Sequence, residues 1–153
     1  MKITDVRAYM HYSVWRNITF VRVDTDEGIS GIGEATIRNK ETAVKAAIEN
    51  HLKPMLIGMS PFDIEKFFHT AFIRDAWRNG AVFNTAISGI EIAMWDIIGQ
   101  KLGQPVYNLL GGKLRDSIPV YANSWFDGAK TPEDFAEAAV KVVAKGSLED
   151  TSG

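Results

Sequence analysis

The chain of 153 residues contains no cysteine, and this absence already excludes several kinds of chemistry. Without cysteine there is no disulfide and no thiol nucleophile, which fits a reducing compartment such as the cytoplasm. A large excess of one charge is absent as well, because 17 basic and 19 acidic side chains leave a formal net charge of −2. A near-neutral chain without a basic stripe is not expected to bind nucleic acid or an anionic membrane as its main partner.

Long apolar runs and targeting signals are also missing from the sequence. The longest uncharged stretch, residues 79–90, contains Asn, Thr, Ser and Gly, and it falls short of the ~18 apolar residues of a membrane-spanning helix. Asp5 and Arg7 lie in the first strand-like segment, so the N-terminus is unlike a secretory signal. Hydrophobic residues make up 46% and charged residues 24% of the chain, which is typical of a soluble globular domain.

Motifs for catalysis or metal binding are scarce. His11, His51 and His69 are the only histidines, and none has a second histidine or a carboxylate at metal-ligand spacing, so structural or surface roles are favoured. The glycines of residues 28–33 lie in a hairpin and not at a helix start, which excludes a phosphate-binding loop. Composition and spacing alone therefore identify no enzyme.

Two acidic residues, Glu91 and Asp96, lie five positions apart on a predicted helix. This spacing directs them to different faces, so they are not expected to form an acid–base pair. Asp96 follows Trp95 among apolar residues, and we expect it to be a buried, paired structural carboxylate.

Alternation of apolar and polar residues predicts three strands in the first third of the chain. The first strand begins at Ile3, the second covers residues 18–24, and the third covers residues 29–35. Residues 24–28 predict a tight turn in which Gly28 takes a positive φ. Gly31 and Gly33 thin the third strand, which indicates a bulge or the close approach of another backbone. The prediction is a three-stranded antiparallel meander.

Helical spacing follows the strands. A helix capped by Asn39 is expected to break or kink at Pro54, and a second helix is expected to begin at a Ser60 cap. The longest helix is predicted for about residues 81–102, with Gly103 as its stop and with a buried face made of Val82, Ala86, Ile90, Ala93, Met94 and Ile97. Residues 1–112 thus predict an α+β domain, with strands first and helices second.

A boundary is expected at Gly111-Gly112. After it, residues 118–124 predict a strand, and Thr131-Pro132-Glu133-Asp134 begins a well-capped helix that Gly146 ends. A strand followed by a helix is the start of a βα array, but the polar residues 147–153 follow in place of the next strand. We therefore expect a domain at 1–112, an incomplete barrel segment at 113–146 and a polar tail at 147–153, as in a chain that is cut short.

Residues 88–112, SGIEIAMWDIIGQKLGQPVYNLLGG, resemble the end of the N-terminal domain in the mandelate racemase and muconate lactonizing branch of the enolase superfamily. Gly31-Ile32-Gly33-Glu34-Ala35 resembles the GxGE element of that branch. Residues 121–125 and 131–133 resemble the first barrel strand and helix of its acid-sugar dehydratases. Within the 88–112 motif, one residue departs from the family pattern: Glu91 stands where Asp is commoner. The resemblance extends to residue 146 and implies a capping domain followed by the first βα unit of a truncated TIM-type barrel.

The reaction that this resemblance implies is removal of a proton α to a carboxylate, followed in the dehydratases by loss of water. Mg²⁺ stabilises the enediolate in such enzymes, and a Lys or His is the base. In the family these groups lie on barrel strands beyond Gly146, so we expect no catalytic residue and no metal ligand in this chain, which would be inactive alone. An aldonate-type sugar acid is the implied substrate of the full-length proteins, which are expected to be homo-oligomers. Racemisation and cycloisomerisation stay open as alternatives to dehydration.

Substrate-closing loops are the part of the family site that this chain would carry. Residues 10–17 look like the first mobile lid segment of the family, and residues 36–40 look like the second. Trp15, Arg16 and Arg38 are candidate substrate-binding residues, since an indole and a guanidinium suit a polyhydroxy carboxylate, although both arginines fit equally well as solvated surface charges. The resemblance also implies that Asn123 faces the site at the end of the first barrel strand and that Trp125 lines its rim.

Two functions from different classes are consistent with these observations. In the first, the chain is the N-terminal portion of a Mg²⁺-dependent acid-sugar dehydratase, truncated or frameshifted. In the second, it is a non-catalytic capping-domain module that associates with itself or with a full-length relative. The uncovered edge of the strand predicted at residues 118–124 and the apolar helix faces favour such association.

Overall fold

The computed structural model describes residues 1–13, 16–77, 80–118 and 120–144. The chain divides into two compact units, Met1–Gly112 and Lys113–Gly153, which we call the first and second unit and describe separately.

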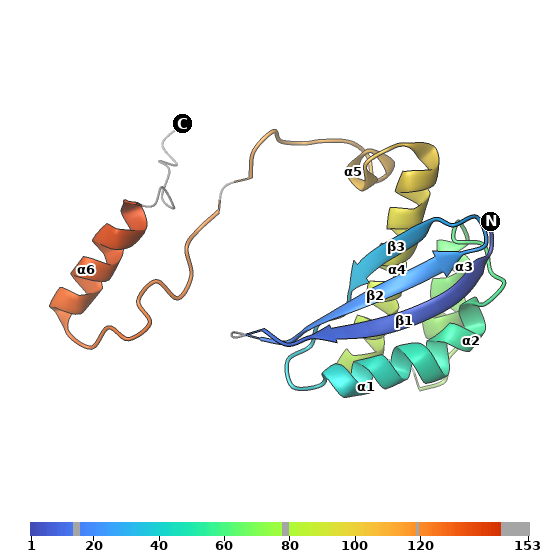
Figure 1. Cartoon of the computed structure of the whole chain (residues 1–153), viewed down its shortest axis with the longest axis horizontal. Coiled ribbons are helices and arrows are strands. Elements are labelled where there is room, and N and C mark those ends of the chain that lie inside the picture. The colour runs from blue at the N-terminus through green and yellow to red at the C-terminus, as the bar shows by residue number, and fades with distance from the viewer. Residues whose placement is uncertain (14–15, 78–79, 119, 145–153) are drawn as a thin grey trace. The chain divides into compact units, whose positions relative to one another are not determined.

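A three-stranded antiparallel sheet forms one layer of the first unit (Figure 1). Its strands are β1 (Ile3–His11), β2 (Ile18–Thr25) and β3 (Ser30–Glu34), in the order β1-β2-β3. Gly28 has a φ of 78° and its N–H donates to the Thr25 carbonyl oxygen at 3.2 Å, which closes the turn between β2 and β3. The predicted meander and its turn are confirmed.

The long helix α4 (Ala81–Leu102) packs against the buried face of this sheet. A Cβ atom built on Gly31 would overlap the carbonyl oxygen of Ala93, and one on Gly33 would overlap that of Gly89. The predicted close approach of a second backbone is therefore confirmed, and its partner is α4. The predicted buried face of the helix is confirmed except at its start, where Val82 is only half-buried.

By length and composition alone, α4 would be long and apolar enough to cross a membrane, with a mean hydropathy of 1.3 over its most apolar window. Glu91 and Asp96 lie within this helix, which is why the sequence holds no long uncharged run. Nine of its residues are buried against the rest of the first unit, among them Ile90, Met94 and Ile97. Its hydropathy is that of a core helix.

The helical region that follows β3 is continuous, although the sequence predicts an interruption in it. It consists of α1 (Glu41–Ala46), the π-helical η1 (Ala47–Leu52) and α2 (Lys53–Leu56). The predicted break at Pro54 does not occur: the π-helical η1 ends at Leu52, and α2 continues through Pro54 to Leu56. The predicted Asn39 cap is also wrong: Asn39 has a φ of 63° and belongs to the preceding turn, so Lys40 flanks the helix without a side-chain cap.

The following helices, α3 (Ile64–Phe68) and the π-helical η2 (His69–Ile73), begin later than predicted. Ser60 is not their cap, because the Asp63 N–H donates to the Ser60 carbonyl oxygen at 3.0 Å and closes a turn first. The apolar stripe is otherwise as expected, since Ile64, Phe67 and Ala71 are buried. The short α5 (Val106–Leu109) completes the first unit.

The second unit contains α6 (Pro132–Val143) with the predicted capping box. The Asp134 N–H donates to Thr131 Oγ1 at 3.2 Å, and the Thr131 N–H donates to Asp134 Oδ2 at 2.9 Å. The strand expected at residues 118–124 is absent from residues 118 and 120–124, because a strand needs a neighbour to bond and this unit offers none among its described residues. The α+β fold as a whole agrees with the prediction.

Glu27 connects the N-terminus to the last turn of α4. Its carboxylate lies 2.9 Å from the Met1 α-ammonium and 2.6 Å from Lys101 Nζ. These bonds, the Lys101 bond first, lower the pKa of Glu27 from 4.5 to about 2. Because the folded-state pKa lies below the unfolded one, this stabilisation is present above about pH 4.5 and is lost as the pH falls toward 2.

We therefore expect Glu27→Gln to lower the melting temperature at pH 7 and to leave it nearly unchanged near pH 2. Thermal melts followed by circular dichroism between these two pH values measure the difference. Glu65→Gln, at an exposed position on α3, is the control and should follow the wild-type curve. A Glu27→Gln deficit that persisted undiminished at pH 2 would show that the ion pairs are not its cause.

Candidate functional site

The two predicted lid loops leave the sheet at the same end. β1 ends at His11 where β2 begins at Ile18, and Phe20 on β2 lies opposite Glu34 at the end of β3. The connection between β1 and β2 and the connection that follows β3 are therefore neighbours (Figure 1). This placement suits two segments that close over one ligand.

Two hydrogen bonds join the loops at their base. The Thr19 N–H donates to Thr36 Oγ1 at 3.1 Å, and the Ala35 N–H donates to the Thr19 carbonyl oxygen at 2.8 Å. Thr19 follows the first loop and Thr36 begins the second. The second loop is thus attached to the strand that leads out of the first.

The candidate arginines are both exposed at this end of the first unit. Arg16 lies just before β2, and Arg38 lies in the turn that precedes α1. In the part of the chain that the structure describes, neither guanidinium takes part in an ion pair, so both are available to an anion. Trp15 lies outside the described residues.

A cavity of about 450 Å³ lies beside the second loop, between the end of β3 and the first half of α4. Five of its six lining residues are polar or charged, namely Glu34, Thr36, Asn84, Thr85 and Ser88, and the sixth is Ile92. A smaller cavity of about 210 Å³ shares Asn84 and Ser88 and adds Phe68, Phe72, Ile87 and Glu91. Hydroxyl and amide groups in this number can bind the hydroxyls of a polyhydroxy ligand.

Sequence reasoning missed this polar lining. The available signal was the spacing of Asn84 and Ser88, which are four residues apart and therefore share one face of a helix that is otherwise largely apolar. Their pairing with Thr36 depends on the fold, because 48 positions separate Thr36 from Asn84.

Acidic and histidine side chains are the groups in this chain that could bind a metal ion. Among the described residues, no three His, Asp or Glu side chains come close enough together to hold an ion. Asp96 is half-buried, and its carboxylate accepts a bond from the Ile32 N–H at 2.9 Å, so its partner is a backbone group rather than a cation. His51 packs against the Phe83 ring with a centroid separation of 6.0 Å.

The second unit contains the other two candidates. Asn123 is exposed, and its Oδ1 accepts a bond from the Ser124 N–H at 2.9 Å. Trp125 packs edge-on against Phe126 at 5.4 Å and lines a cavity of about 440 Å³ together with Asp134 and Lys141. Asn123 and Trp125 thus belong to the second unit, whereas both arginines belong to the first unit.

Comparison with known proteins gives a consistent result. The family profile described as "Mandelate racemase / muconate lactonizing enzyme, N-terminal domain" matches residues 6–111. A D-galactonate dehydratase family member from Musicola paradisiaca is 42% identical over 125 residues, which cover 81% of this chain and 30% of that protein. The D-mannonate dehydratase of Novosphingobium aromaticivorans is 40% identical over 124 residues, covering 81% of this chain and 31% of that protein.

A solved structure of an enolase from Pantoea ananatis, with bound D-gluconate and Mg, superposes with a TM-score of 0.82 at 36% identity. The match covers 95% of this chain and 34% of that one, so it extends beyond the first unit. The chain thus spans about a third of the length of the proteins it matches.

Proposed function

The chain belongs to the mandelate racemase / muconate lactonizing enzyme family, and from this premise we propose that it supplies the capping part of an acid-sugar dehydratase. The predicted resemblance and the predicted capping-domain fold are confirmed by the family match and the structural likeness. The observation that carries the proposal is that relatives at about 40% identity bear the name of a sugar-acid dehydratase or of such a family. The D-gluconate bound to a structural neighbour agrees with it. An aldonate is therefore the proposed substrate class.

The proposed reaction removes the proton α to the substrate carboxylate and expels the β-hydroxyl as water, which leaves an enol that becomes a 2-keto-3-deoxy acid. Magnesium would stabilise the negative charge that develops on the carboxylate. The described residues of this chain do not fit a magnesium site, and we assign neither a metal ligand nor the base to them. Both belong, in this proposal, to the barrel portion that the longer relatives contain.

The role proposed for this chain is to select the substrate and to exclude water. Arg16 and Arg38 would pair with the anionic substrate from the two loops, and Trp15 would cover it. The hydroxyls and amide around Thr36, Asn84 and Ser88 would bind substrate hydroxyls, and Asn123 and Trp125 would line the barrel side. Supporting this assignment, both loops leave the same end of the sheet and their base is joined through Thr36.

The first test is turnover by the chain alone. Incubated with Mg²⁺ and a panel of aldonates, the purified chain should form no 2-keto-3-deoxy acid, as measured by NMR, above a metal-free control. Without a base and a metal, the electrostatic stabilisation that supplies most of the rate is missing. Metal-dependent product would contradict the assignment of both to another part of the protein.

The second test concerns the loops and uses a chimera with the Novosphingobium D-mannonate dehydratase. Residues 1–112 of this chain replace the corresponding part of that enzyme. We expect Arg38→Ala to raise KM for the aldonate about 10-fold, since one charge-assisted hydrogen bond contributes ~1.5–3 kcal/mol. Arg74→Ala, at an exposed arginine beyond η2, is the control and should leave KM unchanged. Equal KM values for the two variants would remove Arg38 from the substrate site.

The alternative, a non-catalytic module, is favoured by one feature of the second unit. Ile118, Val120 and Tyr121 are each about four-fifths exposed, and Phe135 on α6 is 42% exposed. Apolar surface of this kind favours association. If the chain alone has no turnover but is retained by a full-length relative in a pull-down, and Phe135→Lys abolishes that retention, the module function is supported.

A further inference from the structure

The backbone hydrogen bonds of the first unit end abruptly at its last residue. The Gly112 N–H donates to the Tyr107 carbonyl oxygen at 2.8 Å and closes the turn after α5. The next backbone-to-backbone bond along the described chain joins the Asp127 N–H to the Ser124 carbonyl oxygen. Residues 113–118, which we call the connecting segment, are neither helix nor strand, and their backbone makes no hydrogen bond to any residue that the structure describes.

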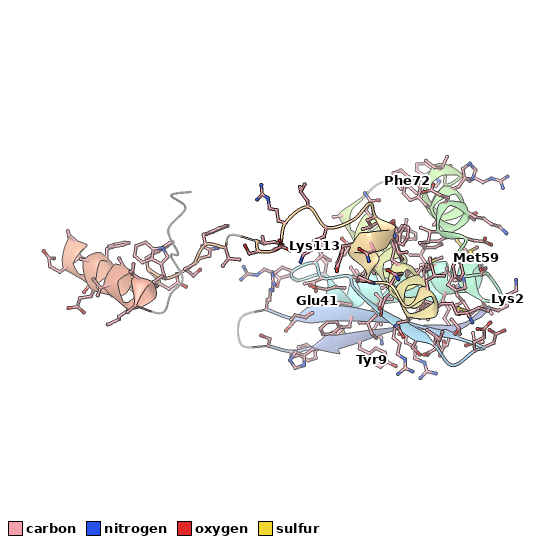
Figure 2. The ribbon with its side chains drawn as sticks, turned by 90° about the horizontal axis from the view of Figure 1, so that it is seen from above. Lys2, Tyr9, Glu41, Met59, Phe72 and Lys113 are labelled. Carbon is pink, nitrogen blue, oxygen red and sulfur yellow. The ribbon has the colours of Figure 1, made fainter. Side chains whose placement is uncertain are left out.

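Every side chain of the connecting segment is exposed. Leu114 is 92% exposed, and Figure 2 shows Lys113 at the residue that directly follows the first unit. Lys113 Nζ lies 2.7 Å from Asp116 Oδ1, an ion pair that water screens because the Asp116 side chain is 98% exposed. An exposed backbone without hydrogen bonds can enter the active site of a protease without prior unfolding.

The hydrophobic core does not depend on the connecting segment. All buried apolar residues of the described chain, from Ile3 to Ile98, belong to the first unit. In the second unit, none of the residues 113–118 and 120–144 is buried. Cleavage between the units would therefore break no core contact, and the first unit should keep its fold.

Basic residues in other irregular segments are held by backbone bonds. Arg38 lies in a turn that is closed by the bond from the Lys40 N–H to the Ile37 carbonyl oxygen, at 3.2 Å. The Arg74 N–H donates to the His69 carbonyl oxygen at 2.9 Å. A protease could bind either arginine in an extended chain only after local unfolding.

Two further basic residues are restricted by their neighbours. The Lys130 N–H donates to Asp134 Oδ2 at 3.0 Å, next to the capping box of α6. Arg16 lies in the short connection between His11 and Ile18, which are paired across β1 and β2. The connecting segment thus offers the basic residues that a protease can reach with the least disturbance of the structure.

We propose that the connecting segment is a cleavage site for trypsin-like proteases, which cut after Lys113 and after Arg115. Such a protease holds a carboxylate in its specificity pocket and binds a basic side chain there. Hydrolysis of the Lys113–Leu114 bond consumes one water molecule and leaves a carboxylate on Lys113 and an ammonium group on Leu114. The cut separates the two loops of the first unit from Asn123 and Trp125, and it would end any joint action of these groups on one substrate.

Limited digestion of the whole 153-residue chain with trypsin, sampled over time and measured by intact mass spectrometry, tests the proposal. Fragments that end at residue 113 or 115 should form at least about 10-fold faster than any fragment cut within residues 1–112, because bonds in the first unit become accessible only on unfolding. The purified fragment 1–113 should retain a cooperative thermal transition in circular dichroism.

A double variant, Lys113→Gln with Arg115→Gln, removes both basic side chains from the connecting segment. We expect the rate at which the whole chain is lost to fall at least about 10-fold, since the specificity pocket then finds no basic side chain in this segment. Lys66→Gln on α3, where the side chain is 69% exposed, is the control and should be digested like the wild type.

A first cut at any basic residue other than Lys113 or Arg115 would overturn the proposal. The same holds if trypsin digests the double variant as fast as the wild-type chain. Degradation of fragment 1–113 as fast as it forms would also contradict it, because the first unit would then not keep its fold after the cut.

Discussion

Gly33→Ala is expected to lower the free energy of unfolding of the first unit by about 3 kcal/mol, at the upper end of the effects of overpacking. A Cβ atom at this position would overlap the carbonyl oxygen of Gly89 and lie 3.0 Å from the Ala93 nitrogen. Both are backbone atoms of α4, so no side chain can rotate away, and the helix must move off the sheet. Urea unfolding followed by circular dichroism measures the loss.

The matched control for this substitution is Gly28→Ala. Gly28 has a φ of 78° but no atom within 4 Å of an added Cβ, so the change costs only backbone strain, about 1 kcal/mol. A Gly33→Ala variant no less stable than Gly28→Ala would mean that β3 and α4 can separate freely. The double substitution of Gly31 and Gly33 is expected to leave the first unit unfolded.

Phe67→Ala is expected to destabilise the first unit by about 3–5 kcal/mol. Phe67 is fully buried and has the largest side chain of the fully buried residues that the structure describes, so its removal leaves a cavity at the point where α3 joins the core. Since small domains are stable by ~5–15 kcal/mol, much of the total would be lost. The midpoint of urea unfolding is the measurement.

Phe62→Ala provides the comparison for the aromatic residue. Phe62 lies just before α3 and is 47% exposed, so its truncation removes less buried surface and should cost about 1 kcal/mol or less. If the two variants lost the same free energy of unfolding, burial of the ring would not determine how much it stabilises the first unit.

The sequence predicted the sheet and its packing against α4 well because the signals are local and specific. Glycine is unusual in a strand and indicates either a bulge or the close approach of another backbone. At Gly31 and Gly33 the cause is the close approach of the α4 backbone. Helix caps were predicted less well. Asn39 and Ser60 carry the side chains of good caps, but the same residues also favour turns, and here the turn is formed in each case.

Features that depend on distant segments could not be derived from the sequence. The pattern of residues 118–124 is that of a strand, yet a strand forms only with a partner, and that partner is not among the described residues of its unit. The candidate arginines were found through their place in loops and through family resemblance. The cavity beside the second loop was not found, because it joins Thr36 with Asn84 and Ser88 from a different element.

If the two loops select the substrate as proposed, the bonds at their base have a consequence for how substrate preference evolves. Since the Thr19 backbone bonds to both Ala35 and Thr36, displacement of one loop is transmitted to the other. Substitutions in the two loops are therefore expected to be epistatic, with joint effects that differ from the sum of the separate ones. A new specificity would then be acquired by exchanging both loops together, and the pair would be inherited as one evolutionary module.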